Sequence, residues 1–224
     1  MKVPFTKDQF FAVFTMYNQA IWPVQILLIA AAVAVLILIV LRRTYAGRTA
    51  VFFISALWLW SGIIYHWLYF RSINPAATIF SAFFVIQAVL LCLLGFSSTR
   101  TMLWSKHHPN VIIGWIMVAY ALAIYPLLGI LFGHPYPSAP TFGAPCPITI
   151  FTFGILLMLP RSPWWVFVIP ALWAIVGFNA ALSFTVFEDY GLLLSAVLAI
   201  GCLVVTKKSR SRVGTGEKNP TIQF

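Results

Sequence analysis

The chain has 224 residues, of which 62% are hydrophobic and 8% are charged, and its mean hydropathy is +0.96. A soluble domain of this length cannot bury so much apolar surface, so the composition excludes a soluble globular fold and indicates an integral membrane protein. The net charge of +10 does not indicate a nucleic-acid-binding protein, because the basic residues stand beside apolar stretches rather than on a polar face with interleaved aromatic residues.

The N-terminal segment carries a helix start signal. Thr6 stands three residues before Gln9, which is the pattern of a capping box and predicts a helix from Lys7. Aromatic residues at helical spacing follow, and Pro23 then interrupts the pattern. Two interpretations are open: the segment lies in the headgroup layer until Pro23 redirects the chain, or it forms the first turns of the first membrane helix.

Seven apolar stretches follow, and each is read as a membrane span because crossing the hydrocarbon takes on the order of 20 helical residues. They cover residues 22–41, 51–70, 76–96, 111–132, 146–160, 164–184 and 190–206. We therefore predict an all-α integral membrane bundle of seven transmembrane helices. It forms a single domain over residues 1–206, and the basic cytoplasmic tail over 207–224 is expected to lack stable structure.

The basic residues fall in alternate gaps between these stretches. Eleven of the fourteen Lys and Arg residues follow the first, third, fifth or seventh stretch, namely Arg42, Arg43, Arg48, Arg100, Lys106, Arg161, Lys207, Lys208, Arg210, Arg212 and Lys218. The positive-inside rule then places the N-terminus outside and the C-terminus in the cytoplasm. Anionic lipid headgroups are the expected partners of Arg42, Arg43, Lys207, Lys208, Arg210 and Arg212.

The fifth stretch is short, and a proline-rich segment precedes it. Its uninterrupted apolar part, residues 148–159, would be only about 18 Å long as a helix, against about 30 Å of hydrocarbon. Residues 133–147 contain five prolines and two glycines and no charged residue, so they do not form a continuous helix. We expect an ordered cap that dips into the outer mouth of the bundle; an ordinary surface loop is the alternative.

Polar side chains are costly inside a bilayer, so their depth is informative. In the predicted orientation most of them lie in the outer half of the bundle or in the outer loops, which predicts a site that opens outward. The candidate ligand-binding residues are His66, His134, Cys146, Tyr65, Tyr136, Asn179 and Asn74.

Three of these residues are potential metal ligands. The folded loop could bring His134 and Cys146 together with His66 around a transition metal. The spacing matches no zinc or copper motif, so haem ligation by the histidines and purely structural roles, such as an aromatic belt around His66, remain open. Imidazole and thiolate also form the pair of cysteine enzymes, but the chain has no nucleophile signature, and a non-enzymatic role is favoured.

Glu188 and Asp189 directly precede the seventh stretch, where carboxylates are stabilised by the helix dipole. Adjacent side chains on a helix point about 100° apart, so the two are not expected to share a proton. Capping is the expected role, and cation entry is the alternative. We find no carboxylate within a predicted span of the sort that a proton-coupled carrier would use.

The outer regions of the chain contain several short patterns, each of which occurs once: Tyr65 with His66, residues 73–77, 133–137 and 140–143, Cys146 with Pro147, and residues 149–154 and 188–191. In these patterns, and over most of the chain up to Thr206, the sequence resembles a family of uncharacterised bacterial multi-pass membrane proteins classified as a domain of unknown function. The resemblance implies a bacterial cytoplasmic (inner) membrane location. It implies no activity, ligand or catalytic residue.

The function favoured by these observations is binding or transport of a small ligand or metal ion in an outward-facing polar pocket. A membrane-embedded redox enzyme or haem-binding protein is the first alternative, and a structural or partner-binding subunit is the second. The oligomeric state does not follow from the sequence.

Overall fold

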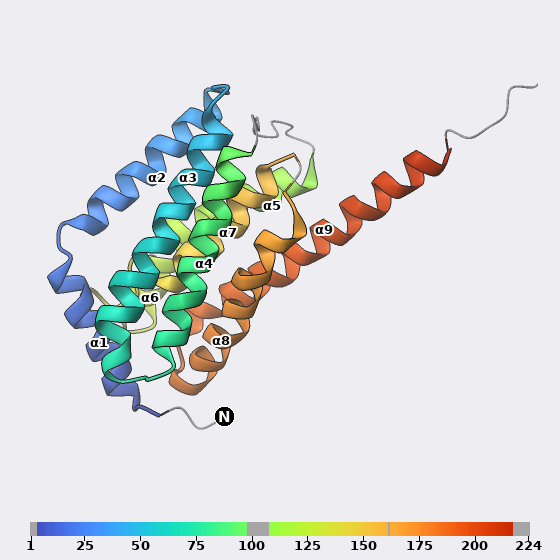
Figure 1. Ribbon diagram of the computed structural model, residues 1–224. Coiled ribbons are helices and arrows are strands. Elements are labelled where there is room, and N and C mark those ends of the chain that lie inside the picture. Colours follow the sequence, from blue (N-terminus) through green and yellow to red (C-terminus); the bar gives the residue numbers. More distant parts are fainter. Residues whose placement is uncertain (1–3, 98–107, 161, 217–224) are drawn as a thin grey trace, which may run out of the picture.

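The computed structural model describes residues 4–97, 108–160 and 162–216, and over these residues the protein is all-helical, as predicted. The α-helices are α1 (Lys7–Ala20), α2 (Val24–Val40), α3 (Ala46–Trp60), α4 (Ala77–Phe96), α5 (Pro109–Ala119), α6 (Tyr125–Leu131), α7 (Pro145–Met158), α8 (Val168–Phe184) and α9 (Tyr190–Gly216) (Figure 1). The π-helical segments are η1 (Ser61–Tyr69) and η3 (Tyr120–Ile124), and the 3₁₀ segments are η2 (Phe70–Ser72), η4 (Trp164–Phe167) and η5 (Phe187–Asp189).

Successive long segments run in alternating directions between two ends of the molecule (Figure 1). One end, which we call the loop end, holds α1, η2, the 132–144 loop and η5. Two hydrogen bonds join its parts: Lys7 Nζ donates to Thr185 Oγ1, and Asn18 Nδ2 donates to the Ala139 carbonyl. The other end, which we call the basic end, holds the 41–45 connection, the end of α7 and the start of α5.

Five of the described helices are long and apolar enough to cross a membrane, or six when the bent pair α1 and α2 counts as one span. The five are Ala46–Ser72, Ala77–Phe96, Pro109–Leu131, Trp164–Phe184 and Phe187–Lys207. They correspond to the second, third, fourth, sixth and seventh predicted stretches. The first and fifth predicted stretches form the shorter helices α2, with 17 residues, and α7, with 14.

The predicted capping box is present at the start of α1, where the Thr6 and Gln9 side chains each bond the other's backbone N–H. Helix α1 meets α2 at an angle of 80°, with Pro23 between them. The N-terminal segment is therefore a separate helix, and the alternative that it forms the first turns of α2 is wrong. Its aromatic side chains pack at the loop end; Phe10, for example, stacks on Phe184 of α8 with ring centroids 5.0 Å apart.

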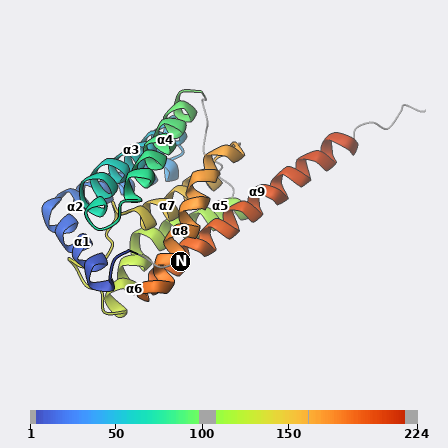
Figure 2. The same ribbon diagram turned by 60° about the horizontal axis from the view of Figure 1, so that its bottom comes forward.

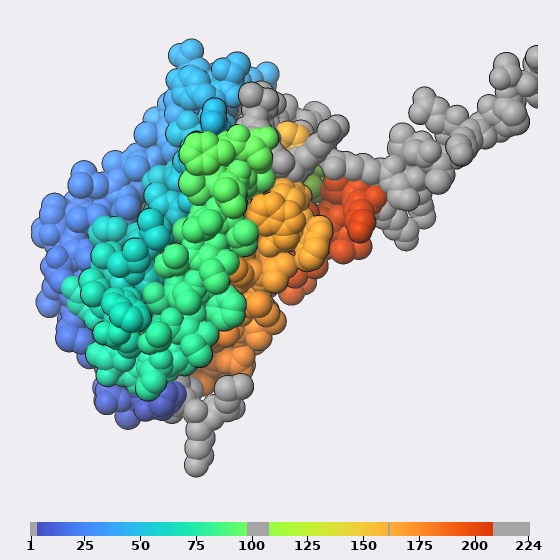
Figure 3. All heavy atoms as spheres, viewed as in Figure 1, coloured from blue at the N-terminus to red at the C-terminus, as the bar shows by residue number. Residues whose placement is uncertain are grey.

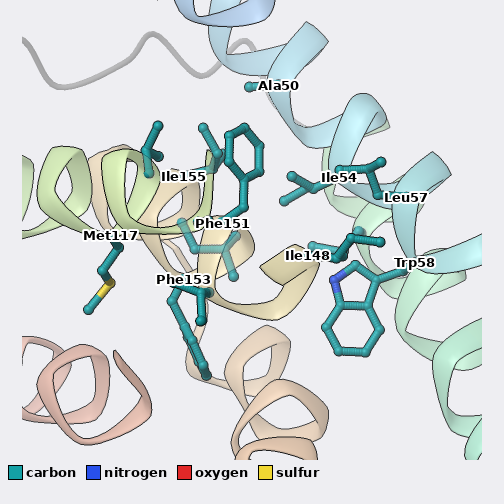
Figure 4. Packing of buried hydrophobic residues seen from close by; sticks show 14 of the residues in the cluster. Ala50, Ile54, Leu57, Trp58, Met117, Ile148, Phe151, Phe153 and Ile155 are labelled. Carbon is teal, nitrogen blue, oxygen red and sulfur yellow. The ribbon is translucent and has the colours of Figure 1, made fainter. Parts of the chain in front are cut away.

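Helix α7 forms the centre of the bundle, because all 14 of its residues are buried. Figure 4 shows its side chains Ile148, Phe151 and Ile155 packed among apolar residues of α3, including Ile54 and Trp58. The face in Figure 3 is covered mainly by α2, α3, α4 and α8, which lie in front of α7. With 14 residues α7 is short, as expected for the fifth stretch, and the other helices enclose it.

Two glycines allow α5 and α7 to cross in close contact. A Cβ added at Gly154 would lie 2.7 Å from the Gly114 carbonyl oxygen, and one added at Gly114 would lie 2.7 Å from the Gly154 carbonyl oxygen. Real Cβ atoms are not found so close to backbone oxygen, so both positions require glycine. This crossing fixes α7 against α5.

The 132–144 loop is ordered and enters the bundle, as expected of a cap. The Asn18 side chain holds it: Nδ2 donates to the carbonyls of Pro137 (2.6 Å) and Ala139 (2.7 Å), and Oδ1 accepts from the Thr141 hydroxyl (2.7 Å). Beyond these contacts Phe142 is buried against Phe151, with ring centroids 5.4 Å apart. The second half of the loop, from Ala139, therefore packs largely in the interior, whereas its first half, including Phe132 and Tyr136, remains at the surface.

Helix α9 has 27 residues and leaves the bundle obliquely, so its C-terminal part stands away from the other helices (Figures 1 and 2). The predicted tail without stable structure is wrong for residues 207–216, which continue this helix, while 217–224 lie outside the described residues. Of the predicted basic residues, Arg100, Lys106, Arg161 and Lys218 also lie outside the described residues, as do the side chains of Lys208, Arg210 and Arg212.

Candidate functional site

The loop end contains a group of buried polar side chains that we call the carboxylate cluster. Its members are His134, Glu188, Asp189, Tyr125 and Cys146. Glu188 and Asp189 belong to η5, at the start of the last helical span, and are 0% and 2% exposed. The others come from the 132–144 loop and from the starts of α6 and α7, so three separate segments converge on η5.

Glu188 pairs with His134, whose Nδ1 lies 3.4 Å from Glu188 Oε1. The His134 side chain is 11% exposed, whereas that of Glu188 is completely buried. Phe11 of α1 covers the imidazole by stacking at a centroid distance of 4.3 Å. His134 is therefore the member of the pair that reaches the surface.

Asp189 points to different partners. Its Oδ1 accepts a 2.5 Å hydrogen bond from the Tyr125 hydroxyl, and the Cys146 thiol hydrogen-bonds to the same carboxyl group. The two adjacent carboxyl groups thus have different neighbours and do not share a proton, as expected from their spacing. The capping role that we expected for them is wrong, since both side chains are engaged with other segments inside the bundle.

The start of α9 is held by Tyr120. The Tyr120 hydroxyl donates to the Glu188 carbonyl at 2.7 Å, and its ring lies directly over Gly191. A Cβ at residue 191 would be 2.3 Å from Tyr120 Cζ, so a larger residue there would require the Tyr120 ring to move. Tyr120 and Tyr125 flank the π-helical segment η3, an irregularity that occurs often at functional sites.

Glu188 has unusual surroundings for a carboxyl group. Neither of its oxygens has a hydrogen bond, and in the described part of the chain no Lys or Arg forms an ion pair with it or with Asp189. Burying an unpaired carboxylate costs several kcal/mol, so such a group holds a proton or pairs with a cation. Among the described residues, His134 is the ionisable side chain that contacts Glu188.

His66 lies near this cluster but in apolar surroundings. It is fully buried in η1, and neither ring nitrogen has a hydrogen bond. The rings of Phe84 and Trp173 lie 4.5 and 4.9 Å from it. It therefore does not meet headgroups or water, and the enclosing rings leave no room for a porphyrin beside it. Tyr65 precedes it and stacks on Phe14, also inside the bundle.

Among residues 4–97, 108–160 and 162–216, no three His, Cys, Asp or Glu side chains are arranged to hold a metal ion. The expected three-ligand set of His66, His134 and Cys146 is therefore not assembled: His66 is enclosed by aromatic rings, His134 faces Glu188, and Cys146 faces Asp189. Cys146 is a free thiol, as are Cys92 and Cys202.

Three other candidate residues have local roles away from the cluster. Asn74 accepts a hydrogen bond from the Ala76 backbone at the start of α4. Tyr136 is half-exposed, and its hydroxyl donates to the Asn18 carbonyl at 3.3 Å. Asn179 is exposed and donates to the Ile175 carbonyl of its own helix. None of the three belongs to the carboxylate cluster.

The sequence analysis interpreted Glu188 and Asp189 as caps, with cation entry as the alternative, and did not include them or Tyr125 among the candidate ligand-binding residues. A signal was present, because the chain has only four acidic residues and two of them are adjacent at the start of an apolar stretch. Carboxyl groups at that position are ordinarily solvated helix caps, and their burial depends on segments far away in the sequence. Glu188 and Asp189 both lie in Phe187–Lys207, a helical span that is long and apolar enough to cross a membrane, whereas the predicted seventh stretch begins only at residue 190.

The protein is an all-helical bundle with several helices long and apolar enough to cross a membrane and a buried acidic cluster at one end. The chain belongs to the Family of unknown function (DUF6064), whose model matches residues 7–214. The expected membership of a family of unknown function is thereby confirmed. The match includes every member of the carboxylate cluster. No curated protein and no solved structure matches the chain.

Proposed function

We propose that the protein crosses the bacterial cytoplasmic membrane seven times, with its loop end outside and its basic end in the cytoplasm. The alternation of helix direction supports this, because α2 and α7 each lead from one end of the bundle to the other (Figure 1). The charges support it as well: Arg42 and Arg43 lie in the 41–45 connection of the basic end, whereas Glu188 and Asp189 lie at the loop end.

We infer that the protein takes up protons from the outside and belongs to the binding or transport class. The observation that carries this proposal is the contact between surface-reaching His134 and fully buried Glu188, whose oxygens have no other partner among the described residues. Ionisable groups inside a membrane protein are costly and mark ion or proton pathways. Histidine changes its charge near neutral pH, so it suits the entry position.

The geometry also supports a path for the proton beyond Glu188, through the hydrogen bonds of Asp189. Asp189 follows Glu188 in the chain and contacts Tyr125 and Cys146, both of which are buried. Tyrosine hydroxyls and thiols can both donate and accept a proton in a hydrogen bond. A proton accepted at His134 and Glu188 can thus be followed by rearrangement of the hydrogen bonds around Asp189.

The test is a pH titration of the purified protein by infrared difference spectroscopy, comparing the wild type with Glu188→Gln. Glutamine has nearly the same shape but carries no exchangeable carboxyl proton. We expect a carboxyl band in the wild type that is lost in Glu188→Gln and altered in His134→Asn, because His134 contacts Glu188. Asp8→Asn is the control, since Asp8 is exposed in the first turn of α1.

Proton uptake into proteoliposomes gives a second readout, with a pH-sensitive dye inside the vesicles and a potassium diffusion potential as the driving force. Wild type and Asp8→Asn should acidify the lumen at the same rate, and Glu188→Gln should be slower by about tenfold or more, as for loss of a proton-transfer group. Identical titrations of Glu188→Gln and Asp8→Asn would show that the cluster is only structural.

A further inference from the structure

The basic end contains a groove that has no part in the carboxylate cluster. It lies where α8 and α9 separate, with the end of α7 as its floor, and encloses about 960 Å³. Cavities that hold small molecules in proteins have volumes on the order of 300–1,000 Å³. The oblique course of α9 in Figures 1 and 2 shows why the groove exists: the two helices pack near η5 and then diverge. The groove is therefore large enough for a ligand.

The walls of the groove are apolar and follow one face of each helix. They are formed by every third or fourth residue of α8 between Val168 and Ile175, and by the same spacing on α9 between Ile200 and Lys207. Leucine side chains of the segment that ends α7 complete the floor. In the proposed orientation these walls lie at the depth of lipid chains, so the groove suits hydrocarbon.

One end of the groove is polar and basic. Lys207 borders it, and His108 lies beside it with a buried Nδ1 that has no hydrogen-bond partner in the described part of the chain. The Asn110 amide and the Thr206 hydroxyl, joined by a 3.1 Å hydrogen bond, complete this border. Among the described residues that line the groove there is no Asp or Glu. The groove thus has an apolar interior and a cationic border, which matches an amphiphile with a negatively charged headgroup.

We propose that this groove binds an anionic phospholipid of the surrounding bilayer, with an acyl chain between α8 and α9 and the phosphate at Lys207 and His108. Charge complementarity carries the choice of occupant: the border offers the Lys207 ammonium beside the His108 ring and the Asn110 amide, and the whole chain has a net charge of +10. Lysine binds phosphate as a point charge, and the desolvated chain packs against the apolar walls. The proposal is independent of proton binding at the loop end.

The experiment is native mass spectrometry of the full chain, released from detergent with dioleoyl phosphatidylglycerol or with dioleoyl phosphatidylcholine at equal concentration. We expect one retained phosphatidylglycerol and at least threefold less phosphatidylcholine. Ala171→Trp should fill the groove and abolish retention, because Ala171 lines it. Ala82→Trp is the matched control, since Ala82 is exposed on α4 and does not line the groove.

A charge variant keeps the test valid if Ala171→Trp does not fold. Lys207→Gln should lower retention of phosphatidylglycerol to that of phosphatidylcholine, whereas Arg48→Gln, which removes one positive charge at the start of α3 outside the groove, should leave it unchanged. Quenching of Trp164, a groove residue that is 70% exposed, by dibrominated phosphatidylglycerol should locate the lipid, with Trp164→Phe to identify the signal. Equal retention of the two lipids, or unchanged retention in both Ala171→Trp and Lys207→Gln, would overturn the proposal.

Discussion

The two ends of the bundle differ in how their side chains are packed. At the loop end, polar side chains are packed against one another, and Glu188 is completely buried. At the basic end, apolar helices separate and leave a groove of about 960 Å³ between α8 and α9. In a membrane protein polar groups must find partners inside the bundle, whereas apolar surface is already satisfied by lipid. The polar residues of the loop end are therefore tightly packed, and the groove lies at the basic end, between apolar helices.

The largest effect is expected from Gly154→Leu, because α7 joins the two ends. Any side chain at residue 154 meets the Gly114 backbone, and we expect a loss of at least about 3 kcal/mol, the upper part of the range for overpacking. The measurement is the temperature at which half of the detergent-solubilised protein leaves the monodisperse peak. Gly201→Leu is the control, since a Cβ at Gly201 has no neighbour within 4 Å. Equal midpoints for the two variants would mean that the ends do not depend on α7.

A smaller effect, confined to the loop end, is expected from Asn18→Ala, which removes three hydrogen bonds to the 132–144 loop. At about 1 kcal/mol for each bond, the loop should open more often and expose the buried Cys146. Labelling of Cys146 by a membrane-impermeant maleimide, followed by peptide mass, should become faster by a factor of ten or more.

The control for this loop variant is Asn179→Ala, because Asn179 bonds only within its own exposed helix face. Lipid retention at the groove should be the same in both variants. If Asn18→Ala altered lipid retention as strongly as Cys146 labelling, the two ends would be one coupled unit rather than two separate ones.

The smallest effect is expected from Tyr125→Phe, which removes the hydroxyl that donates to Asp189. A buried acceptor that loses its partner costs about 1–3 kcal/mol, and retained bonding from Cys146 places the expected loss near the lower limit. Thermal unfolding measures it, with Tyr136→Phe as the control because that ring is half-exposed and its hydroxyl bond is 3.3 Å long. No difference between the variants would show that the Tyr125 bond contributes nothing to stability.

The fold could largely be predicted from the sequence, because hydrophobic length and charge position are local properties. The five long helices, the capping box at Thr6 and the short helix near 146–160 were all visible in this way. The continuation of α9 beyond Lys207 was not, since a polar, basic composition is compatible with both a helix and a disordered tail. Local composition thus predicts which segments form apolar helices, but it predicts less well the residue at which a helix ends.

The site was harder to predict, because it depends on contacts between distant segments. The sequence led us to expect that His134 and Cys146 meet around a metal ion, whereas in the structure His134 faces Glu188 and Cys146 faces Asp189. It could not show that Glu188 would be buried, since this requires His134 and Tyr120 to converge on η5 from elsewhere in the chain. The groove was invisible for the same reason: it follows from the angle between α8 and α9, and both helices read as ordinary apolar spans.

The position of α7 has a consequence for how the protein is made. At about 1.5 Å per residue its 14 residues extend about 21 Å, less than the hydrocarbon thickness of about 30 Å. Such a segment partitions poorly into lipid when it leaves the translocon alone. Its neighbours include α9, which is synthesised after it. We therefore expect α7 to wait at the translocon until the last span arrives, so that the bundle closes around it in a single late step of biogenesis.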